Sequence, residues 1–397
     1  MIIKPLIRSN ICINAHPKGC AKDVEHQIAY VEKKAALRGK LPNAPKNVLV
    51  LGCSTGYGLA SRIAAAFECG ANTIGVSFER EGTESKSGTP GWYNNMAFDR
   101  AAKAKGLGCV TFNGDAFSDE MRKQVIEASR QFGKFDLVIY SVASAVRVDP
   151  VTGEKYRSVL KPLEKTFSGA TMDVVTGKFS IITAEVANEE EKRQTVKVMG
   201  GEDWARWIHQ LSEAGVLAEG VKTVAYSYIG PTYTHAIYRD GTIGAAKKDI
   251  ERTARELDAE LSKSLHGEAY ISVNKGLVTR SSAVIPLIPL YISILFKIMK
   301  RNGTHEGCIE QMERLFAERL YTGKPVPTDD EHRIRIDELE LDPKVQDEVA
   351  KYMPIVNENN IAELGDIEGY RHDFLATNGF DIEGIDYDKD VERMDTI

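Results

Sequence analysis

Short apolar runs alternate with amphipathic stretches along the chain, and this pattern predicts strands and helices in turn. The apolar runs lack strict alternation, which is typical of parallel strands that helices cover on both faces. Six runs are expected as strands, at residues 46–51, 73–78, 109–113, 135–140, 222–228 and 269–274. The order of the elements predicts an α/β fold with a Rossmann-like, doubly wound parallel sheet.

The chain of 397 residues is longer than one such sheet requires, since a single core rarely exceeds about 250–300 residues. We expect one domain over residues 1–397, with an insertion at residues 151–220 and a C-terminal region at residues 280–397 that covers the substrate. The insertion carries a hairpin pattern, TMDVVTGKFSI, and two helical stretches. One stretch bears Trp204 and Trp207, three residues apart on a helix, and both are expected in the core.

The first predicted strand runs directly into a glycine-rich turn, GCSTGYG, which precedes a helical run, LASRIAAAFECG. Glycine permits a tight turn and a close approach of the backbone to a pyrophosphate. That anion binds at the helix N-terminus, where the N–H groups and the helix dipole favour it. The turn therefore predicts a dinucleotide site. Its contacting residues are expected to be Gly52, Cys53, Ser54, Thr55, Gly56 and Tyr57.

An acidic residue, Glu79, follows the second predicted strand at the distance expected for a carboxylate that binds the adenosine ribose. Phe78 precedes it and is expected to contact the cofactor as well. A carboxylate repels the 2′-phosphate of NADPH, so Glu79 favours NADH. Arg80 argues the other way, because a guanidinium beside the ribose accommodates a 2′-phosphate.

Two tyrosines and a lysine in the segment SYIGPTYTHAIYRDGTIGAAK, residues 227–247, predict a hydride-transfer site. They are Tyr228, Tyr238 and Lys247. In short-chain dehydrogenases a tyrosine and a lysine share one site. The lysine lies near the cofactor ribose there and lowers the tyrosine pKa, so that the phenol donates a proton.

The spacing between Tyr238 and Lys247 is too wide for one helix. Nine residues would separate them by about 13.5 Å along the axis and place them on opposite faces. Gly241 and Gly244 are poor residues for a helix interior. We therefore expect the helix to begin after Gly244, near Ala245, and Tyr238 to lie on a loop that folds back over Lys247.

Other candidate residues also follow predicted strands. The carboxyl ends of parallel strands share one edge of the sheet, and ligands bind there. We therefore expect one cleft built from segments that are far apart in the sequence. Besides the glycine turn, Glu79 and Tyr228, the residues expected there are Asp115 and Ala116, beside adenine, and Val142, Ala143, Leu277, Val278 and Thr279.

Motifs spread over the whole chain are shared with one family of reductases. They are PKG at residues 17–19, GCSTGYG, SFER, YSVAS, SYIGPTYTHAIYRDGTIGAAK, NKGLVTRSSAVIPLIPLY and the closing FDIEGIDYDKDV. On these motifs the chain resembles the single-chain bacterial trans-2-enoyl-CoA reductases, which are also the long form of enoyl-acyl-carrier-protein reductase. The Tyr-x8-Lys spacing marks that family.

The resemblance implies membership of the short-chain dehydrogenase superfamily and an NADH-dependent reduction of 2-enoyl thioesters to saturated acyl thioesters in fatty acid metabolism. It implies that Tyr238 is the proton donor, that Lys247 binds the ribose and that Tyr228 lies nearest the thioester. Residues 277–279 would bind the nicotinamide carboxamide. Either tyrosine could donate to the enolate oxygen that develops in the reaction, and the sequence leaves open which one does.

Three other functions stay open at this point. The acyl group can be carried by acyl carrier protein in place of CoA. A short-chain dehydrogenase of ketoacyl or hydroxyacyl thioesters would share the fold. It would, however, show Tyr-x-x-x-Lys with a serine about a dozen residues before it, and Asn-Asn-Ala-Gly where this chain has Tyr140 to Ala143. A non-catalytic NAD-binding sensor would keep the glycine turn but have no use for Tyr238 and Lys247.

Composition argues against several other classes of protein. A net charge of −6 argues against a basic surface for nucleic acid. The six cysteines lack Cys-x-x-Cys spacing, so neither a metal site nor a disulfide framework is expected. The N-terminus has charges within its apolar run, unlike a secretory signal. We expect a cytoplasmic monomer whose partner is a small-molecule acyl thioester, carried by CoA or by acyl carrier protein.

The apolar run AVIPLIPLYISILF, residues 283–296, is too short for a membrane span and contains Pro286 and Pro289. It closely follows residues 277–279, so we interpret it as a mobile wall over the acyl chain, which needs an apolar lining. A buried core helix is the alternative.

Three residues near the expected site have simpler explanations. Lys248 is as basic as Lys247, but adjacent helical residues point about 100° apart, so only one of the two faces the cofactor. Cys53 is interpreted as a small apolar filler, because no histidine lies nearby in the sequence to activate it. His235 is interpreted as a loop hydrogen-bonding residue in preference to a proton relay.

Overall fold

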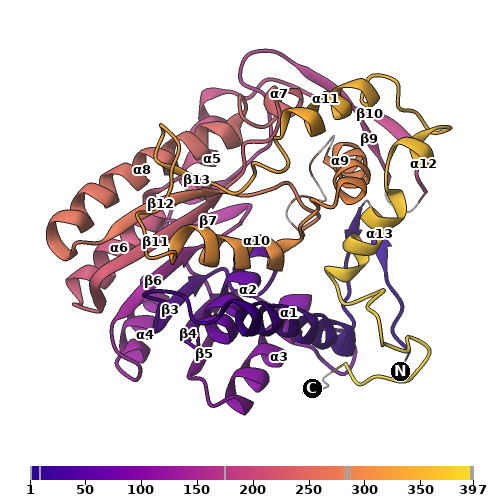
Figure 1. Ribbon diagram of the computed structural model, residues 1–397. Coiled ribbons are helices and arrows are strands. Elements are labelled where there is room, and N and C mark those ends of the chain that lie inside the picture. Colours follow the sequence, from indigo (N-terminus) through magenta and orange to yellow (C-terminus); the bar gives the residue numbers. More distant parts are fainter. Residues whose placement is uncertain are drawn as a thin grey trace.

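Among the residues that the structure describes, a seven-stranded parallel sheet forms the centre of the molecule (Figure 1). The computed structural model describes residues 2–8, 10–173, 176–280, 282, 285 and 288–393. The strand order is β13-β12-β11-β6-β3-β4-β5, which confirms the expected Rossmann-like doubly wound fold. The bounds are β3 Asn47–Leu51, β4 Asn72–Ser77, β5 Cys109–Asn113, β6 Phe135–Tyr140, β11 Leu217–Ser227, β12 Glu268–Val273 and β13 Arg333–Arg335.

Helices cover both faces of this sheet, as Figure 1 shows. One layer holds α1 (Pro17–Arg38), α2 (Gly56–Ile63), α3 (Pro90–Ala104) and α10 (Cys308–Leu315), and the other holds α4 (Asp119–Ser129), α6 (Glu202–Glu213) and α8 (Thr242–Leu265). α2 and α10 continue as the π-helical turns η1 (Ala64–Glu68) and η2 (Phe316–Leu320). Val48 and Val50 of β3 pack with the first layer, and Leu49 and Leu51 pack with the second. This double coverage explains why the strands are apolar on both sides.

Most strand bounds lie close to those expected from the sequence, and β5 and β6 match them. β11 begins before the expected residue 222, because Leu217 already pairs with Phe135 before the register shifts at Lys222. The apolar pattern does not predict β13, since only Ile334 of its three residues is apolar. This strand forms by parallel pairing with the end of β12.

Two hairpins and two helices separate β6 from β11 in the sequence. The hairpins pair β7 (Val146–Val148) with β8 (Lys155–Arg157), and β9 (Phe167–Met172) with β10 (Phe179–Ala184). The second is the hairpin expected around TMDVVTGKFSI, and its residues Val174 and Val175 lie outside the described part of the chain. The helices are α5 (Glu189–Met199) and α6. A further short hairpin near the N-terminus pairs β1 (Ile7–Arg8) with β2 (Ile11–Cys12).

Trp204 and Trp207 of α6 are fully buried against the sheet, as expected. The indole N–H of Trp204 donates to Thr223 Oγ1 in β11 (2.9 Å), and that of Trp207 donates to the carbonyl oxygen of Ala116 after β5 (3.0 Å). Both polar atoms are therefore satisfied inside the core. α6 is thus part of the helical layer that covers the sheet.

A second core lies beside the sheet and is built around α9 (Ile288–Asn302). Figure 1 shows α11 (Pro343–Tyr352), α12 (Ile361–Leu364) and α13 (Ile367–Ala376) gathered around this helix. Residues 288–296 are all buried there, as a core helix requires. Residues 283, 284, 286 and 287 of the run lie outside the described residues. No described helix has the length and hydropathy needed to cross a membrane.

Candidate active site

The structure brings several of the candidate segments into contact at the carboxyl edge of the sheet. The glycine turn after β3 meets the segment after β6, since a β-carbon on Gly52 would lie 2.3 Å from the carbonyl oxygen of Ser141. The same turn meets the segment after β12. A β-carbon on Gly56 would lie 3.7 Å from Cγ2 of Thr279. Strands that are far apart in the sequence therefore end around one turn.

Close packing within the glycine turn fixes where α2 begins. A β-carbon on Gly58 would lie only 1.9 Å from the carbonyl oxygen of Gly52, so this position has no room for a larger residue. α2 starts at Gly56, directly after its N-cap residue Thr55. The N-terminal end of the helix dipole thus points into the turn, where it favours an anion.

Glu79, after β4, holds its carboxylate next to the same turn. Oε1 accepts a hydrogen bond from Ser54 Oγ (2.6 Å), and Oε2 lies 3.7 Å from a guanidinium nitrogen of Arg280. The Glu79 side chain is only 8% exposed, whereas the ring of Phe78 is 81% exposed. Arg80 is exposed. The carboxylate is therefore fixed in place, and an apolar ring beside it is open to solvent.

The residues expected after β5 and β6 lie in segments that are held by hydrogen bonds or are partly exposed. Oδ1 of Asp115 accepts the N–H of Phe117 (2.9 Å), and the carbonyl of Ala116 is taken by an indole of α6. Val142 is half-buried and Ala143 is exposed. These segments are ordered by local contacts.

Tyr228 and Tyr238 pack edge to face just beyond β11, with ring centroids 5.2 Å apart and planes inclined at 73°. Tyr238 lies in the turn between α7 (Thr232–His235) and α8, as expected for a loop residue. Its carbonyl oxygen accepts the N–H of Gly244 (3.0 Å), which ties the turn to the first turn of α8.

The start of α8 differs from the expectation. The helix begins at Thr242, before Gly244 and not after it. A β-carbon on Gly244 would lie 1.8 Å from the carbonyl oxygen of Arg239. Gly244 therefore does not interrupt the helix. It provides the space in which the tyrosine-bearing turn packs against α8.

Burial controls the ionisation of Tyr238, and it raises the pKa of the phenol to about 12. The phenol is therefore not made acidic in the structure, unlike the tyrosine expected from short-chain dehydrogenases. The side chain is 9% exposed, and the loss of solvent around the phenolate causes this rise in pKa. Tyr238 is a neutral phenol near pH 7, the form that donates a hydrogen bond.

Lys247, one turn into α8, directs its amine toward the end of β11, where Nζ donates to the carbonyl oxygen of Tyr226 (3.1 Å). Burial lowers the pKa of the amine to about 8, against an opposing effect of Glu251. The amine is therefore still mostly charged at pH 7. Lys248 is exposed, in agreement with the expectation that only one of the two lysines faces inward.

The segment after β12 forms an ordered loop at the same edge. Leu277 and Val278 are buried. Ser282 Oγ donates to the carbonyl oxygen of Leu277 (2.6 Å), and the N–H of Thr279 donates to Ser282 Oγ (2.9 Å). One serine hydroxyl thus fixes the loop from both sides.

Three residues near the site have structural roles. Cys53 is fully buried and burial raises the pKa of its thiol, which fits its interpretation as a filler. Nε2 of His235 donates a hydrogen bond to the carbonyl oxygen of Gly230 (3.1 Å), as expected for a loop residue. Tyr57, expected at the cofactor, donates its hydroxyl to the carbonyl oxygen of Lys275 (2.6 Å) and so supports the loop after β12.

Sequence reasoning misses a buried polar cluster behind Tyr228. Its centre is Glu340, which follows β13 and is fully buried. Tyr291 of α9 and Lys275 at the end of β12 are buried with it. No motif marks Glu340, which stands in the acidic stretch DELELD, residues 337–342, and looks like an ordinary surface residue.

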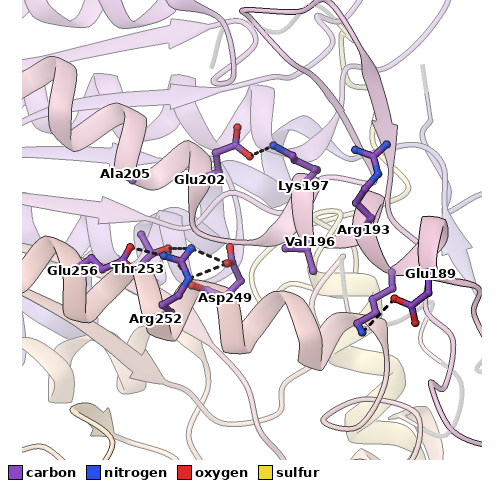
Figure 2. Close-up of a pocket in the computed structure, with 11 residues that line it drawn as sticks. Glu189, Arg193, Val196, Lys197, Glu202, Ala205, Asp249, Arg252, Thr253 and Glu256 are labelled. Carbon is purple, nitrogen blue, oxygen red and sulfur yellow. Dashed lines mark hydrogen bonds and ion pairs between the residues drawn. The ribbon is translucent and has the colours of Figure 1, made fainter.

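A surface depression of about 460 Å³ lies away from this edge, between α5, α6 and α8. Figure 2 shows that charged side chains line it and that many of them pair with one another. Lys197 binds Glu202 (2.6 Å), and Arg252 binds Asp249 (2.8 Å). These pairs are typical of a solvated helix surface, and the depression contains none of the candidate residues.

The described residues include no group of three histidine, cysteine or acidic side chains that could hold a metal ion. The six cysteines, all within the described ranges, are unpaired.

Family models match almost the whole chain. Residues 2–84 match a model described as the NAD(P)H binding domain of trans-2-enoyl-CoA reductase, and residues 86–321 match its catalytic region. Residues 328–391 match a model described as the enoyl reductase FAD binding domain.

Individual relatives and solved structures agree with these matches. The chain is 60% identical to a trans-2-enoyl-CoA reductase [NADH] of Treponema denticola over the full length of both chains. The crystal structure of the Treponema denticola trans-2-enoyl-CoA reductase in complex with NAD superposes with a TM-score of 0.96, again over all of both chains. A reductase structure from Clostridium acetobutulicum in complex with NADH gives 0.96 at 43% identity, over 99% of this chain and 98% of that one. An enoyl-[acyl-carrier-protein] reductase [NADH] of Coxiella burnetii is 53% identical over 99% of this chain and 96% of its own.

Proposed function

This chain belongs to the trans-2-enoyl-CoA reductase family, and from that premise we propose that it uses NADH to reduce the carbon–carbon double bond of 2-enoyl-CoA thioesters in fatty acid metabolism. The observation that carries the proposal is the packed pair Tyr228 and Tyr238 at the carboxyl edge of the sheet. The amine of Lys247 donates a hydrogen bond to the carbonyl oxygen of Tyr226, two residues before Tyr228. A ketoacyl reductase or an NAD-binding sensor would have no need of this arrangement.

The residues at the edge suit NADH. The glycine turn lets the backbone approach a pyrophosphate at the N-terminus of α2. The fixed carboxylate of Glu79 suits the ribose hydroxyls, and the exposed ring of Phe78 beside it suits an adenine face. The buried loop at residues 277–279 would hold the carboxamide side. The amine of Lys247 would bind the second ribose, which places a positive charge near the reacting groups.

Tyr238 acts in this proposal as the donor to the thioester oxygen. When NADH is bound, it supplies the hydride that adds to the β-carbon of the substrate, and negative charge develops on the thioester oxygen. Tyr238 is buried, and its high pKa keeps the phenol protonated. A pre-aimed donor to such an oxygen is commonly worth about 2.7–4 kcal/mol of barrier. Protonation of the α-carbon then completes the saturated thioester.

The apolar part of the site is proposed to lie along α9. Leu277 and Val278 belong to the same core as the first turns of this helix, so an acyl chain that passes the nicotinamide loop would meet α9 next. A core helix can also serve as a wall. We therefore keep the proposal that residues 288–296 line the acyl chain.

The matched FAD model carries no role here, because the side chains of residues 328–391 do not suit a flavin dinucleotide. Acidic residues far outnumber basic ones in this stretch, although the pyrophosphate of FAD is an anion. Arg333 is paired with Asp329 (3.0 Å) and Arg335 with Asp337 (2.7 Å). The helices of this region bury their apolar faces around α9.

We further propose that the chain acts as one domain over residues 1–397, with its insertion at 151–220 and its C-terminal region at 280–397, and as a cytoplasmic monomer that binds no nucleic acid. The net charge of −6 supports the last point. Gel filtration of the purified protein tests the monomer.

Acyl carrier protein is the second candidate for the acyl handle, because the Coxiella relative bears that name. Crotonyl-CoA and crotonyl-acyl-carrier-protein, compared side by side by the loss of NADH absorbance, test both. The proposal expects the higher kcat/KM with crotonyl-CoA. Turnover of the carrier-protein substrate alone would assign the enzyme to carrier-bound fatty acid synthesis. If neither substrate causes NADH to be oxidised, the protein is not an enoyl reductase.

A further inference from the structure

One carboxylate joins three segments directly behind the tyrosine pair. Glu340 Oε1 accepts hydrogen bonds from the hydroxyls of Tyr228 (3.0 Å) and Tyr291 (2.6 Å), and Oε2 accepts the N–H of Gly276 (2.6 Å). These donors come from the end of β11, the end of β12 and the first turn of α9. A fully buried side chain thus ties the substrate tyrosine, the nicotinamide loop and the apolar helix together.

Burial raises the pKa of Glu340, and its hydrogen-bond donors and a nearby buried lysine oppose that rise. Three donors converge on its two oxygens, and each bond to a charged acceptor is stronger than a neutral one. The charge of Lys275, itself buried, opposes the rise that burial causes in the pKa of Glu340. Gln346 fixes the backbone of the residue by donating to the Glu340 carbonyl oxygen (2.6 Å).

The two tyrosines of the site differ in what their hydroxyls do. The Tyr228 hydroxyl gives its proton to Glu340. Within the described residues, by contrast, no group hydrogen-bonds the hydroxyl of Tyr238, although the two rings touch. A hydroxyl carries one proton to donate. Tyr228 is therefore committed to the carboxylate, while Tyr238 keeps its proton for another acceptor.

We propose that Glu340 is a positioning residue that holds the hydroxyl of Tyr228 and thereby leaves Tyr238 as the sole donor to the thioester oxygen. This rests on the enoyl reductase activity proposed above and goes beyond it, because it gives the C-terminal segment after β13 a part in the reaction. Tyr228 offers the substrate its ring and the lone pairs of its oxygen.

Glu340→Gln tests the proposal with the least change in volume. The amide keeps one acceptor oxygen but turns the other into a donor, so either the two phenols or the Gly276 N–H loses its acceptor. Turnover of crotonyl-CoA is expected to fall about tenfold or more, with NADH affinity, measured by fluorescence, close to that of the wild type. Glu338→Gln is the matched control. Glu338 lies two residues earlier and pairs with Arg314 and Arg319 at the surface, and its loss should leave turnover unchanged.

A double-mutant cycle separates positioning from a general loss of structure. If Glu340 acts through the Tyr228 hydroxyl, Glu340→Gln should cost less than about twofold once Tyr228→Phe has removed that hydroxyl. Should Glu340→Gln fail to bind NADH, Glu340→Asp takes its place in the cycle, because it keeps the charge and withdraws the carboxylate by one methylene.

The outcomes distinguish this inference from the proposed function. An active wild type with a tenfold loss that disappears in the Tyr228→Phe background supports it. If the wild type is active and Glu340→Gln turns over at the same rate, the inference is overturned. It is also overturned if the losses of Glu340→Gln and Tyr228→Phe multiply in the double variant. In both cases the proposed reductase activity still stands. A wild type that oxidises no NADH with any enoyl thioester contradicts the proposed function, and this inference falls with it.

Discussion

The two sides of the proposed site, one for the cofactor and one for the substrate, are assembled in different ways. The part proposed for the pyrophosphate and the adenosine ribose is local: β3, the glycine turn, α2, β4 and Glu79 all lie within residues 47–79. The substrate side collects Tyr228, Tyr238, Gly276, Tyr291 and Glu340 from segments more widely separated in the sequence. A motif describes the first because neighbouring residues make the site. The second exists only when β11, β12, β13 and α9 are packed together, so a change there should disturb turnover more than cofactor binding.

Tyr238→Phe is expected to give the largest difference between the effect on turnover and the effect on NADH binding. The ring packing against Tyr228 remains, but the donor to the thioester oxygen is lost, so kcat should fall about a hundredfold or more while NADH still binds. Steady-state kinetics with crotonyl-CoA and a fluorescence titration with NADH measure the two effects. Tyr233→Phe is the control, since Tyr233 is a half-exposed tyrosine in α7. Near-normal turnover in Tyr238→Phe would remove this residue from the mechanism.

Lys247 should affect both sides, because it contacts the end of β11 and is proposed to bind the ribose. Its pKa is about 8, so the amine is charged below that pH and neutral above it. NADH binding should therefore weaken as pH rises through about 8. Lys247→Met should raise the KM for NADH about tenfold at pH 7 and abolish this dependence, whereas Lys248→Met should change neither.

Lys275 provides the competing explanation for a transition near that pH. It is buried at the end of β12 and its pKa is also lowered to about 8. A pH dependence that persists in Lys247→Met would assign the titration to Lys275, and so to the substrate side.

A moderate effect confined to the cofactor side is expected from Glu79→Gln. Loss of the charge weakens the bonds to the ribose hydroxyls and removes the repulsion of a 2′-phosphate. The ratio of kcat/KM for NADH to that for NADPH should fall about tenfold, with little change in kcat. Glu81→Gln, two residues on and exposed, serves as the control. An unchanged ratio would mean that another residue distinguishes the cofactors.

The smallest effect is expected from the acyl-chain wall. Leu290 is buried in the first turn of α9, and Leu290→Phe should cut activity on long acyl chains a few-fold more than on four-carbon ones, because short chains do not reach the narrowed depth. Ile298→Phe, further along the same helix and equally buried, controls for overpacking. If Leu290→Phe lowers activity equally at every chain length, α9, including Leu295, is a core helix and does not line the acyl chain.

The sequence predicts six of the seven described sheet strands, because each of these six is an apolar run that packs between helices. It also places the glycine turn, Glu79 and Tyr228 at strand ends, and Tyr238 on a loop before the helix that carries Lys247. Two features escape it. β13 has one apolar residue and forms only by pairing with β12. Glu340 lies in an acidic stretch, and only the packed structure buries it.

The spacing of residues in the sequence also does not predict the pKa of Tyr238. The motif suggests a tyrosine made acidic by a lysine, but the depth of burial determines the balance and raises the pKa of Tyr238 instead. The start of α8 is a similar case. In the sequence, Gly244 reads as a helix breaker. The structure shows that a glycine is needed there because the preceding turn packs against it.

The most direct test of the account follows the hydride and the proton separately. Crotonyl-CoA is reduced with NADH deuterated at the transferable position of the nicotinamide, and the product is analysed by mass spectrometry and NMR. The account predicts butyryl-CoA with deuterium at the β-carbon and a proton from solvent at the α-carbon. Consumption of NADH without deuterium at the β-carbon, or no reduction of crotonyl-CoA at all, would contradict it.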